Sequence, residues 1–284
     1  MPRVTAAPST AGRKPKLGQH FLSDQSAAVQ IVDALGEISQ KTVLEIGPGR
    51  GVLTSLLARK ARRLIAIELD RVLAAQLRME FNQTENVEIV EGDALAIDFN
   101  TLFGPRPGTT RTGMELVHDP VRVVGNIPYY ITSDLILRLF ESRQYVECMV
   151  LMVQLEVADR LAAEPGGSEY GLLSATAQLY SRVEKLFELV PGAFSPPPKV
   201  HSAVVRLTIA PQLEALGVPE KEFIEFLKLS FAQKRKTLSN NLKPRYGQKV
   251  LEAALEEAEV KPTVRAEALP LETSAAIFRA LMKN

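Results

Sequence analysis

The sequence predicts an α/β fold with a mostly parallel sheet, followed by a small α-helical C-terminal domain. Short apolar runs alternate with stretches of helical period from residue 25 onward, and this alternation is typical of successive βαβ units. A glycine-rich turn closes the first apolar run, as in many nucleotide-binding α/β proteins. Beyond Pro211 the helical periods continue without any strand-like run.

Aliphatic and β-branched residues, which favour buried strands, dominate the runs predicted as strands. These strands are Thr42–Ile46, Leu64–Ile67, Val87–Val90, Val121–Val124, Cys148–Val153 and Val200–Ile209. The stretches between them repeat apolar residues at helical spacing. They predict the helices Ser26–Leu35, Val52–Arg59, Val72–Phe81 and Thr132–Phe140. In the C-terminal part the predicted helices are Glu220–Ala232, Lys249–Glu257 and Ser274–Met282.

The chain is divided by composition into three parts. Residues 1–24 form a basic arm and a short segment after it, residues 25–212 the α/β domain, and residues 213–284 the helical domain. The arm is either a solvated tail or a nucleic-acid contact, because residues 1–17 carry basic side chains and no acid. The long stretch Gly104–Pro120 is interpreted as a surface insertion rather than a functional loop.

The composition excludes several classes of protein. With 46% hydrophobic and 24% charged residues among 284, the chain is neither disordered nor fibrous. A single cysteine and three scattered histidines predict no disulfide and no metal site. No apolar run has membrane-spanning length and no secretory leader is recognisable. We therefore expect a cytoplasmic protein without a metal or a membrane partner, and a monomer.

Three glycines and two carboxylates follow consecutive predicted strands. Gly47, Gly49 and Gly51 would let backbone N–H groups approach a ligand. Glu68 ends the second strand, 21 residues after Gly47, where such folds place an acid that accepts both ribose hydroxyls. Asp93 follows the third strand, where its carboxylate could accept a hydrogen bond from the exocyclic amine of an adenine. Either carboxylate alone is more often a helix cap or a solvated charge. Together with the glycine loop, the two carboxylates predict an adenosine-containing ligand.

A second motif follows the fourth strand. Gly125-Asn126-Ile127-Pro128-Tyr129-Tyr130 joins a buried strand to a polar amide, a rigid proline and an aromatic ring. Asn-x-Pro is also ordinary turn sequence. Here the Asn126 side chain and the Ile127 carbonyl can accept hydrogen bonds from an exocyclic amine, while Tyr129 stacks on a nucleobase. The glycine spacing and this motif together argue against a dehydrogenase.

The chain resembles the bacterial small-subunit ribosomal RNA adenine N6,N6-dimethyltransferases, the KsgA/RsmA family. The matching motifs cover the chain from Lys16 almost to its end. They are Lys16–Leu22, Glu45–Gly51, Ile67–Asp70, Gly92–Ala94, Asn126–Tyr129, Gln154–Val157, Tyr170–Ser174, Phe194–Val200 and Gln233–Leu238. His20 is a departure, because many relatives carry Asn there.

The resemblance implies a Rossmann-like methyltransferase fold and S-adenosyl-L-methionine as the methyl donor. Methyl groups would pass to N6 of two adjacent adenines near the 3′ end of 16S ribosomal RNA, within a pre-30S particle during ribosome biogenesis. The cofactor-binding residues would be His20, Leu22, Gly47, Glu68, Asp93 and Asn126. The catalytic residues would be Asn126, Ile127, Pro128, Tyr129 and Phe194, with Phe194 stacking on the target base or serving as an ordinary core residue.

Three hypotheses about the function remain. The chain is a small-subunit dimethyltransferase, a large-subunit methyltransferase of the macrolide-resistance type, or a ribosome-assembly factor that binds RNA without turnover. The motifs at Phe194–Val200 and Gln233–Leu238 favour the small-subunit dimethyltransferase. Six basic residues in the C-terminal domain favour an RNA-binding patch over a solvated helix face. They are Lys228, Lys234, Arg235, Lys236, Lys243 and Arg245.

Overall fold

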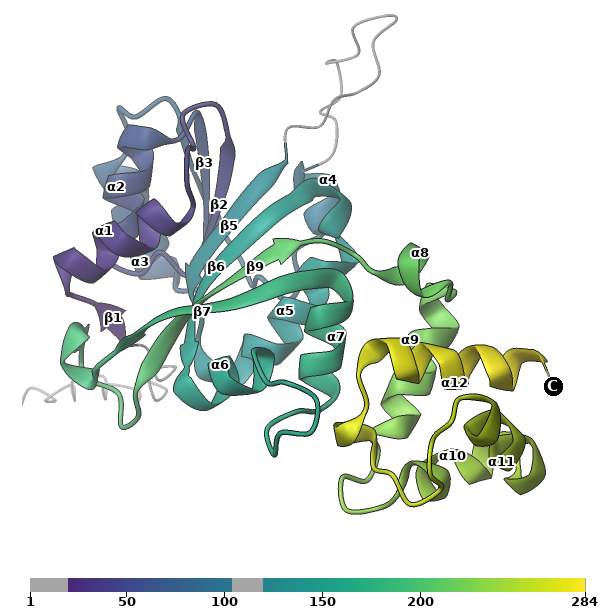
Figure 1. Ribbon diagram of the computed structural model, residues 1–284. Helices are drawn as coiled ribbons and strands as arrows, with labels where there is room; N and C mark the ends of the chain where they lie inside the picture. Colours follow the sequence, from purple (N-terminus) through teal and green to yellow (C-terminus); the bar gives the residue numbers. More distant parts are fainter. Residues whose placement is uncertain (1–19, 104–119, 284) are drawn as a thin grey trace, which may run out of the picture.

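The computed structural model describes residues 20–103 and 120–283. The basic arm and the Gly104–Pro120 loop lie outside these ranges, apart from the last residue of the loop. The core element is a seven-stranded sheet with the strand order β4-β3-β2-β5-β6-β9-β7 (Figure 1). Strands β4 to β6 are parallel, and β9 pairs antiparallel with both β6 and β7. The predicted α/β fold with a mostly parallel sheet is confirmed.

All six predicted strands are present in the sheet. Their bounds are β2 Thr42–Ile46, β3 Arg63–Glu68, β4 Val87–Glu91, β5 Val121–Asn126, β6 Val146–Gln154 and β9 Ser202–Ile209. The seventh strand, β7 Ser181–Leu189, was not predicted. It lies at the edge of the sheet and mixes charged with apolar side chains, so it lacks the continuous apolar run on which the prediction depended.

Helices cover both faces of the sheet. On one face are α1 Gln25–Ala34 and α2 Val52–Lys60, and on the other α5 Thr132–Glu141, α6 Leu155–Leu161 and α7 Leu172–Tyr180. Neighbouring strand residues serve opposite faces, since side chains alternate along a strand. Val43 packs with α1 and α2, whereas Leu44 packs with α5 and α7. Helices α3 Arg71–Glu80 and α4 Phe99–Phe103 flank β4 in the chain.

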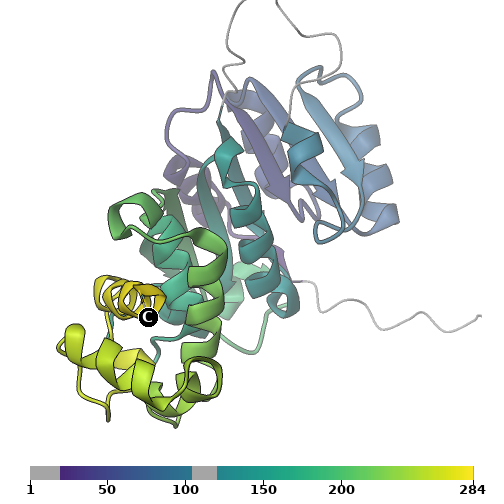
Figure 2. The ribbon, with the colours of Figure 1, turned by 90° about the vertical axis from the view of Figure 1, so that its right-hand side faces the viewer.

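Beyond Gln212 the described residues form helices and no strand, as predicted. The helices are α8 Leu213–Leu216, α9 Glu220–Ser230, α10 Leu238–Tyr246, α11 Gln248–Glu257 and α12 Leu271–Lys283. They gather at one end of the molecule (Figures 1 and 2). The rings of Phe223, Phe226 and Phe278 form their centre. This apolar core continues into that of α5 and α7, so the domain boundary near residue 213 stays a prediction.

A two-stranded ribbon brings the start of the described chain to the sheet. In it, β1 Phe21–Leu22 pairs antiparallel with β8 Phe194–Ser195. Leu22, Phe194 and α1 share one apolar cluster. The segment from His20 is thereby held beside the carboxyl ends of the parallel strands. No helix in the described ranges is long and apolar enough to cross a membrane.

Candidate active site

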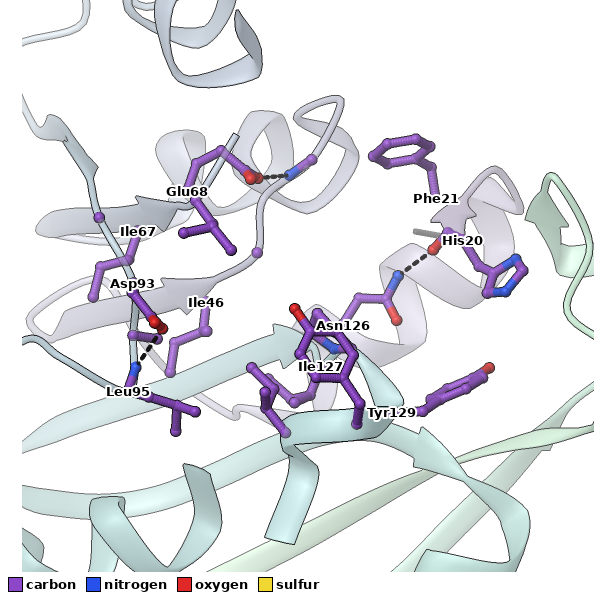
Figure 3. A pocket seen from close by; sticks show the side chains of 18 residues that line it. His20, Phe21, Ile46, Ile67, Glu68, Asp93, Leu95, Asn126, Ile127 and Tyr129 are labelled. Atoms are coloured by element: carbon purple, nitrogen blue, oxygen red, sulfur yellow. Dashed lines mark hydrogen bonds between the residues drawn. The ribbon is translucent and has the colours of Figure 1, made fainter. Parts of the chain in front are cut away.

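A pocket lies at the carboxyl edge of the parallel strands. Its walls come from the ends of β2, β3, β4 and β5 and from the segment at His20 and Phe21 (Figure 3). Open α/β sheets bind their ligands at this edge, where neighbouring strands leave in different directions. The position agrees with the site predicted from the three glycines and two carboxylates.

The loop after β2 depends on glycine. Gly49 has a φ of +58°, and a Cβ atom there would lie 2.7 Å from the Phe21 ring. Phe21 therefore covers the loop closely, and the Arg50 guanidinium lies 4.6 Å from the centre of the same ring. The N-terminal segment and the glycine loop thus form one packed wall.

Glu68 ends β3 and is 2% exposed. Its carboxylate accepts hydrogen bonds from the Gly49 N–H at 3.0 Å and the Asp70 N–H at 2.8 Å. Burial raises the pKa of this carboxyl, and the two backbone N–H donors oppose that rise. Each carboxylate oxygen keeps a further lone pair, so Glu68 can still accept hydrogen bonds from a ligand.

Asp93 follows β4 and lines the same pocket. Its Oδ1 accepts a hydrogen bond from the Leu95 N–H at 2.9 Å (Figure 3). This short loop fixes the direction of the carboxylate, because the acceptor and the donor are two residues apart. The second oxygen, Oδ2, remains available to a polar group in the pocket.

Asn126 ends β5 and joins it to the N-terminal segment. Its Nδ2 donates a hydrogen bond to the main-chain oxygen of His20 at 2.6 Å (Figure 3). The side-chain oxygen Oδ1 is therefore the atom left to accept a hydrogen bond from a ligand. The preceding residue must be glycine, since a Cβ at Gly125 would lie 2.6 Å from the Ile46 carbonyl oxygen.

Tyr129 is held by residues far away in the sequence. Its hydroxyl group shares a 2.8 Å hydrogen bond with Ser202 Oγ on β9. Its ring lies 6.0 Å from the His20 ring, centre to centre, with 28° between the ring planes. His20 is in turn fixed by a 2.8 Å contact between Nδ1 and the Pro196 carbonyl.

Most of the predicted site residues line this pocket, and two do not. His20, Gly47, Glu68, Asp93, Asn126, Ile127, Pro128 and Tyr129 are together there. Leu22 and Phe194 face the apolar cluster with α1 instead, and Phe194 is 4% exposed. A stacking role for Phe194 stays a prediction, and it would require the ring to leave that cluster.

Three further residues, Phe21, Leu69 and Tyr130, line the pocket and were not among the predicted site residues. Each directly follows or precedes a predicted site residue, so adjacency to the motifs was the available signal. Tyr130 is 61% exposed, a high value for an aromatic side chain.

Glu45 lies beneath the glycine loop and is also buried. The Thr54 hydroxyl donates to Glu45 Oε2 at 2.7 Å. Burial raises the pKa of Glu45 to about 8, and the nearby Glu68 charge adds to this. Glu45 is therefore mainly a neutral acid at pH 7.

Comparison with known proteins places this site in a family. The model described as "Ribosomal RNA adenine dimethylase" matches residues 11–283. A protein of Koribacter versatilis named "Ribosomal RNA small subunit methyltransferase A" is 54% identical over the whole of both chains. A dimethyladenosine transferase from Plasmodium falciparum superposes with a TM-score of 0.76 at 27% identity, covering 93% of this chain and 98% of that one.

A second solved structure, the 23S rRNA methyltransferase ErmE, has a TM-score of 0.69 and 28% identity, covering 92% and 99% of the two chains. These likenesses confirm the predicted Rossmann-like methyltransferase fold. Together with the full-length match of the family model, they establish that this chain belongs to the ribosomal RNA adenine dimethylase family.

Proposed function

We propose that this protein transfers methyl groups from S-adenosyl-L-methionine to N6 of two adjacent adenines near the 3′ end of 16S ribosomal RNA. The products would be N6,N6-dimethyladenosines formed during ribosome biogenesis. Family membership supports adenine in ribosomal RNA as the acceptor, and the named relatives support the small subunit. The arrangement around Asn126 is the observation that carries the proposal.

The residues of the pocket fit the proposed cofactor. The backbone at Gly47 and Gly49 approaches the pocket without side chains, which leaves room for the methionine part. Glu68 would hold the ribose hydroxyls and Asp93 the adenine amine. The main chain at His20 and Phe21 closes one side of the pocket, with Leu22 anchoring this segment in the core. When bound, the cofactor supplies an electrophilic methyl group on a sulfonium.

Asn126 and its neighbours would prepare the acceptor. The lone pair on N6 of adenine is delocalised into the ring, so it is a poor nucleophile. Hydrogen bonds from N6–H to Asn126 Oδ1 and the Ile127 carbonyl would favour a more tetrahedral nitrogen and aim it at the methyl carbon. Asn126 is pre-oriented for this, because its Nδ2 is already bonded to His20 O.

The remaining groups would position the base. Tyr129 would stack on the adenine ring, with its hydroxyl group held by Ser202. Pro128 restricts the backbone between Asn126 and Tyr129. The nitrogen becomes acidic once it is methylated, so its proton passes to solvent after attack and no strong base is required.

The proposed partner is small-subunit ribosomal RNA within a pre-30S particle, bound by a monomer in the cytoplasm. RNA needs cationic surface. Lys234, Arg235 and Lys236 are exposed in the turn between α9 and α10. Lys234 Nζ donates to the Ser168 carbonyl, in the loop that follows α6. This hydrogen bond joins the basic turn to the loop between α6 and α7, and α6 begins at the carboxyl end of β6.

Methyl transfer from radiolabelled S-adenosyl-L-methionine to unmodified small subunits tests the proposal. We expect label in adenines near the 3′ end of the small-subunit RNA, at up to two methyl groups per base. Large-subunit RNA is the control. Label only in large-subunit RNA would replace the proposal with the other methyltransferase reading, and binding without label would favour an assembly factor without turnover.

A further inference from the structure

We infer that the loop between α6 and α7 (residues 162–171) is a brace that fixes the basic turn relative to the pocket, with Tyr170 as its anchoring residue. The inference rests on the proposed function and deepens it. The distance between the basic turn and Asn126 then decides which adenines of a bound RNA reach the pocket. In Figure 1 this loop lies between the sheet and the C-terminal helices.

The brace begins beside the groups that would hold the acceptor. Strand β6 ends at Gln154, which pairs with Ser202, the partner of the Tyr129 hydroxyl group. The Ile127 N–H donates to the Met152 carbonyl at 3.2 Å, so the turn after β5 is bonded to the same strand end. Helix α6 follows directly and, with 7 residues, is about 10 Å long. The loop therefore starts from a point that is fixed relative to the pocket.

Helix α7 holds the first part of the brace. The Gln178 side chain donates from Nε2 to the Ala163 carbonyl at 2.8 Å, and the Ser174 hydroxyl group donates to the Arg160 carbonyl. Because these bonds fix the end of α6 and the start of the loop against α7, the loop leaves the α/β part in a defined direction.

Tyr170 anchors the other end of the loop in the helical C-terminal part. This residue is 1% exposed. Its ring contacts the Phe231 ring edge-on, with centres 6.1 Å apart and 60° between the ring planes. Phe231 directly follows α9 and stands three residues before Lys234. The ring contact thus fixes the chain at the point where it enters the basic turn.

Two hydrogen bonds add to this anchor. Lys234 Nζ in the basic turn donates to the Ser168 carbonyl of the loop. The Gly166 N–H donates to the Glu267 carbonyl, just before α12, at 2.7 Å. The loop therefore contacts three separate segments of the helical part, which are the end of α9, the basic turn and the approach to α12.

A different set of contacts holds the other end of α9. Glu220, its first residue, accepts hydrogen bonds from Arg143 at 2.6 Å and from the Tyr180 hydroxyl group at 2.9 Å. With 11 residues, α9 is about 16 Å long, so a rotation of about 5° at Glu220 would move the basic turn by about 1.4 Å. A misplacement of about 1 Å can lower a rate by about a hundredfold. The position of the turn therefore needs the second support that the brace gives.

Three leucine substitutions test the brace. Tyr170→Leu and Phe231→Leu remove the ring contact from either side. Phe223→Leu is the matched control, because it removes a fully buried ring of the helical part that packs on Phe226 and Phe278. Methyl-transfer assays on small subunits give kcat and KM for RNA, both corrected for the folded fraction. Mass spectrometry of the RNA gives the number of methyl groups on each adenine.

We expect Tyr170→Leu and Phe231→Leu each to lower kcat by about tenfold and to raise KM by less than about threefold, since RNA still binds but its adenines are misplaced. The ratio of methyl groups on the two adjacent adenines should change by more than about twofold. Tyr170→Phe keeps the ring and should lose less than Tyr170→Leu. Phe223→Leu should match the wild type once corrected for folding.

Two outcomes would overturn the brace. One is equal losses of kcat in Tyr170→Leu, Phe231→Leu and Phe223→Leu, which would mean that the loop acts through stability alone. The other is a wild-type kcat and a wild-type methyl ratio in both Tyr170→Leu and Phe231→Leu.

Hydrogen exchange gives a readout that needs no RNA. The Lys236 N–H donates to the Gln233 carbonyl at 3.0 Å within the basic turn. We expect this amide to exchange several-fold faster in Tyr170→Leu than in the wild type or in Phe223→Leu, because the turn loses its support and opens locally. Unchanged exchange in Tyr170→Leu would overturn the brace. Faster exchange in a protein that transfers no methyl group would support the brace and contradict the proposed activity.

Discussion

The two halves of the pocket are assembled over very different sequence distances. In the half that we propose for the cofactor (the cofactor half), Asp93 bonds to a residue 2 positions away, and Glu68 to one 19 positions away. In the half that we propose for the methyl acceptor (the acceptor half), Tyr129 bonds to Ser202 across 73 residues, and Asn126 to His20 across 106. The contact between His20 and Pro196 spans 176 residues.

This difference predicts how each half responds to substitution. The cofactor half consists of strand ends and their own turns, so a change there should weaken one ligand and leave the acceptor side in place. The acceptor half joins the N-terminal segment, β5 and the chain around β8 and β9. A change there should affect catalysis more than cofactor binding, because several segments set the position of one base.

The largest effect is expected for Asn126→Ala. Loss of the Oδ1 acceptor should lower single-turnover methyl transfer at least about a hundredfold, comparable to losing one preorganised transition-state hydrogen bond. The bond from Nδ2 to His20 O is lost as well. That should cost about 1 kcal/mol of folding free energy, or about 2–4 °C in melting temperature.

Cofactor affinity measured on the same preparation separates catalysis from folding. It should stay within about threefold of the wild type if Asn126 acts on the acceptor. A stable Asn126→Ala variant with near-wild-type transfer would remove Asn126 from the catalytic residues. A large fall in melting temperature with activity proportional to the folded fraction would make it a turn residue.

Glu68→Ala should act on the cofactor half of the pocket. We expect cofactor affinity to fall more than tenfold by calorimetry, because a hydrogen bond to a charged group is worth roughly 1.5–3 kcal/mol. The loop donor Gly49 N–H also loses its partner. Glu68→Gln is the matched control, with the same size and one acceptor oxygen, and should lose less. Unchanged affinity in both variants would exclude Glu68 from the cofactor site.

The same contrast explains which parts of the site could be read from the sequence. Gly47, Glu68 and Asp93 follow apolar runs at regular spacing, and a parallel sheet necessarily brings such strand ends together. The contact between the His20 and Tyr129 rings could not be predicted from the sequence, because it depends on the pairing of β1 with β8 near residue 194. The sequence likewise leaves open whether Phe194 is a base-stacking or a core residue.

The secondary structure shows the same division: local sequence predicts some elements and misses others. Buried strands such as β2 are continuous apolar runs, which local sequence reveals. Strand β7 is an edge strand in which charged and apolar residues are mixed, so only its pairing with β9 defines it. Helix α10 contains Pro244, and a proline inside a helical pattern normally argues against a helix.

Simultaneous replacement of Lys234, Arg235 and Lys236 by alanine should affect RNA alone. We expect RNA affinity to fall several-fold and the slope of log affinity against log salt to shrink by up to about three, roughly one for each lost phosphate contact. Cofactor affinity should be unchanged, because the three residues lie outside the pocket. An unchanged salt slope in filter-binding titrations would make the turn a solvated surface.

The last prediction concerns a buried proton beneath the cofactor half of the pocket. Burial raises the pKa of Glu45 from 4.5 to about 8. Between these two values the folded protein keeps a proton that the unfolded chain releases. The free energy of unfolding therefore falls as the pH rises, by at most about 1.4 kcal/mol per pH unit from this group. Below pH 4.5 both states are protonated, and above pH 8 both are ionised, so the loss is confined to this interval.

Glu45→Gln removes this titration and keeps an oxygen that can accept from the Thr54 hydroxyl. Relative to the wild type, the variant should gain stability steadily from pH 5 to pH 8, as measured by urea unfolding at three pH values in that interval. Parallel pH profiles for the two proteins would mean that Glu45 is ionised in the fold. In that case the buried charges of Glu45 and Glu68 would lie side by side beneath the glycine loop.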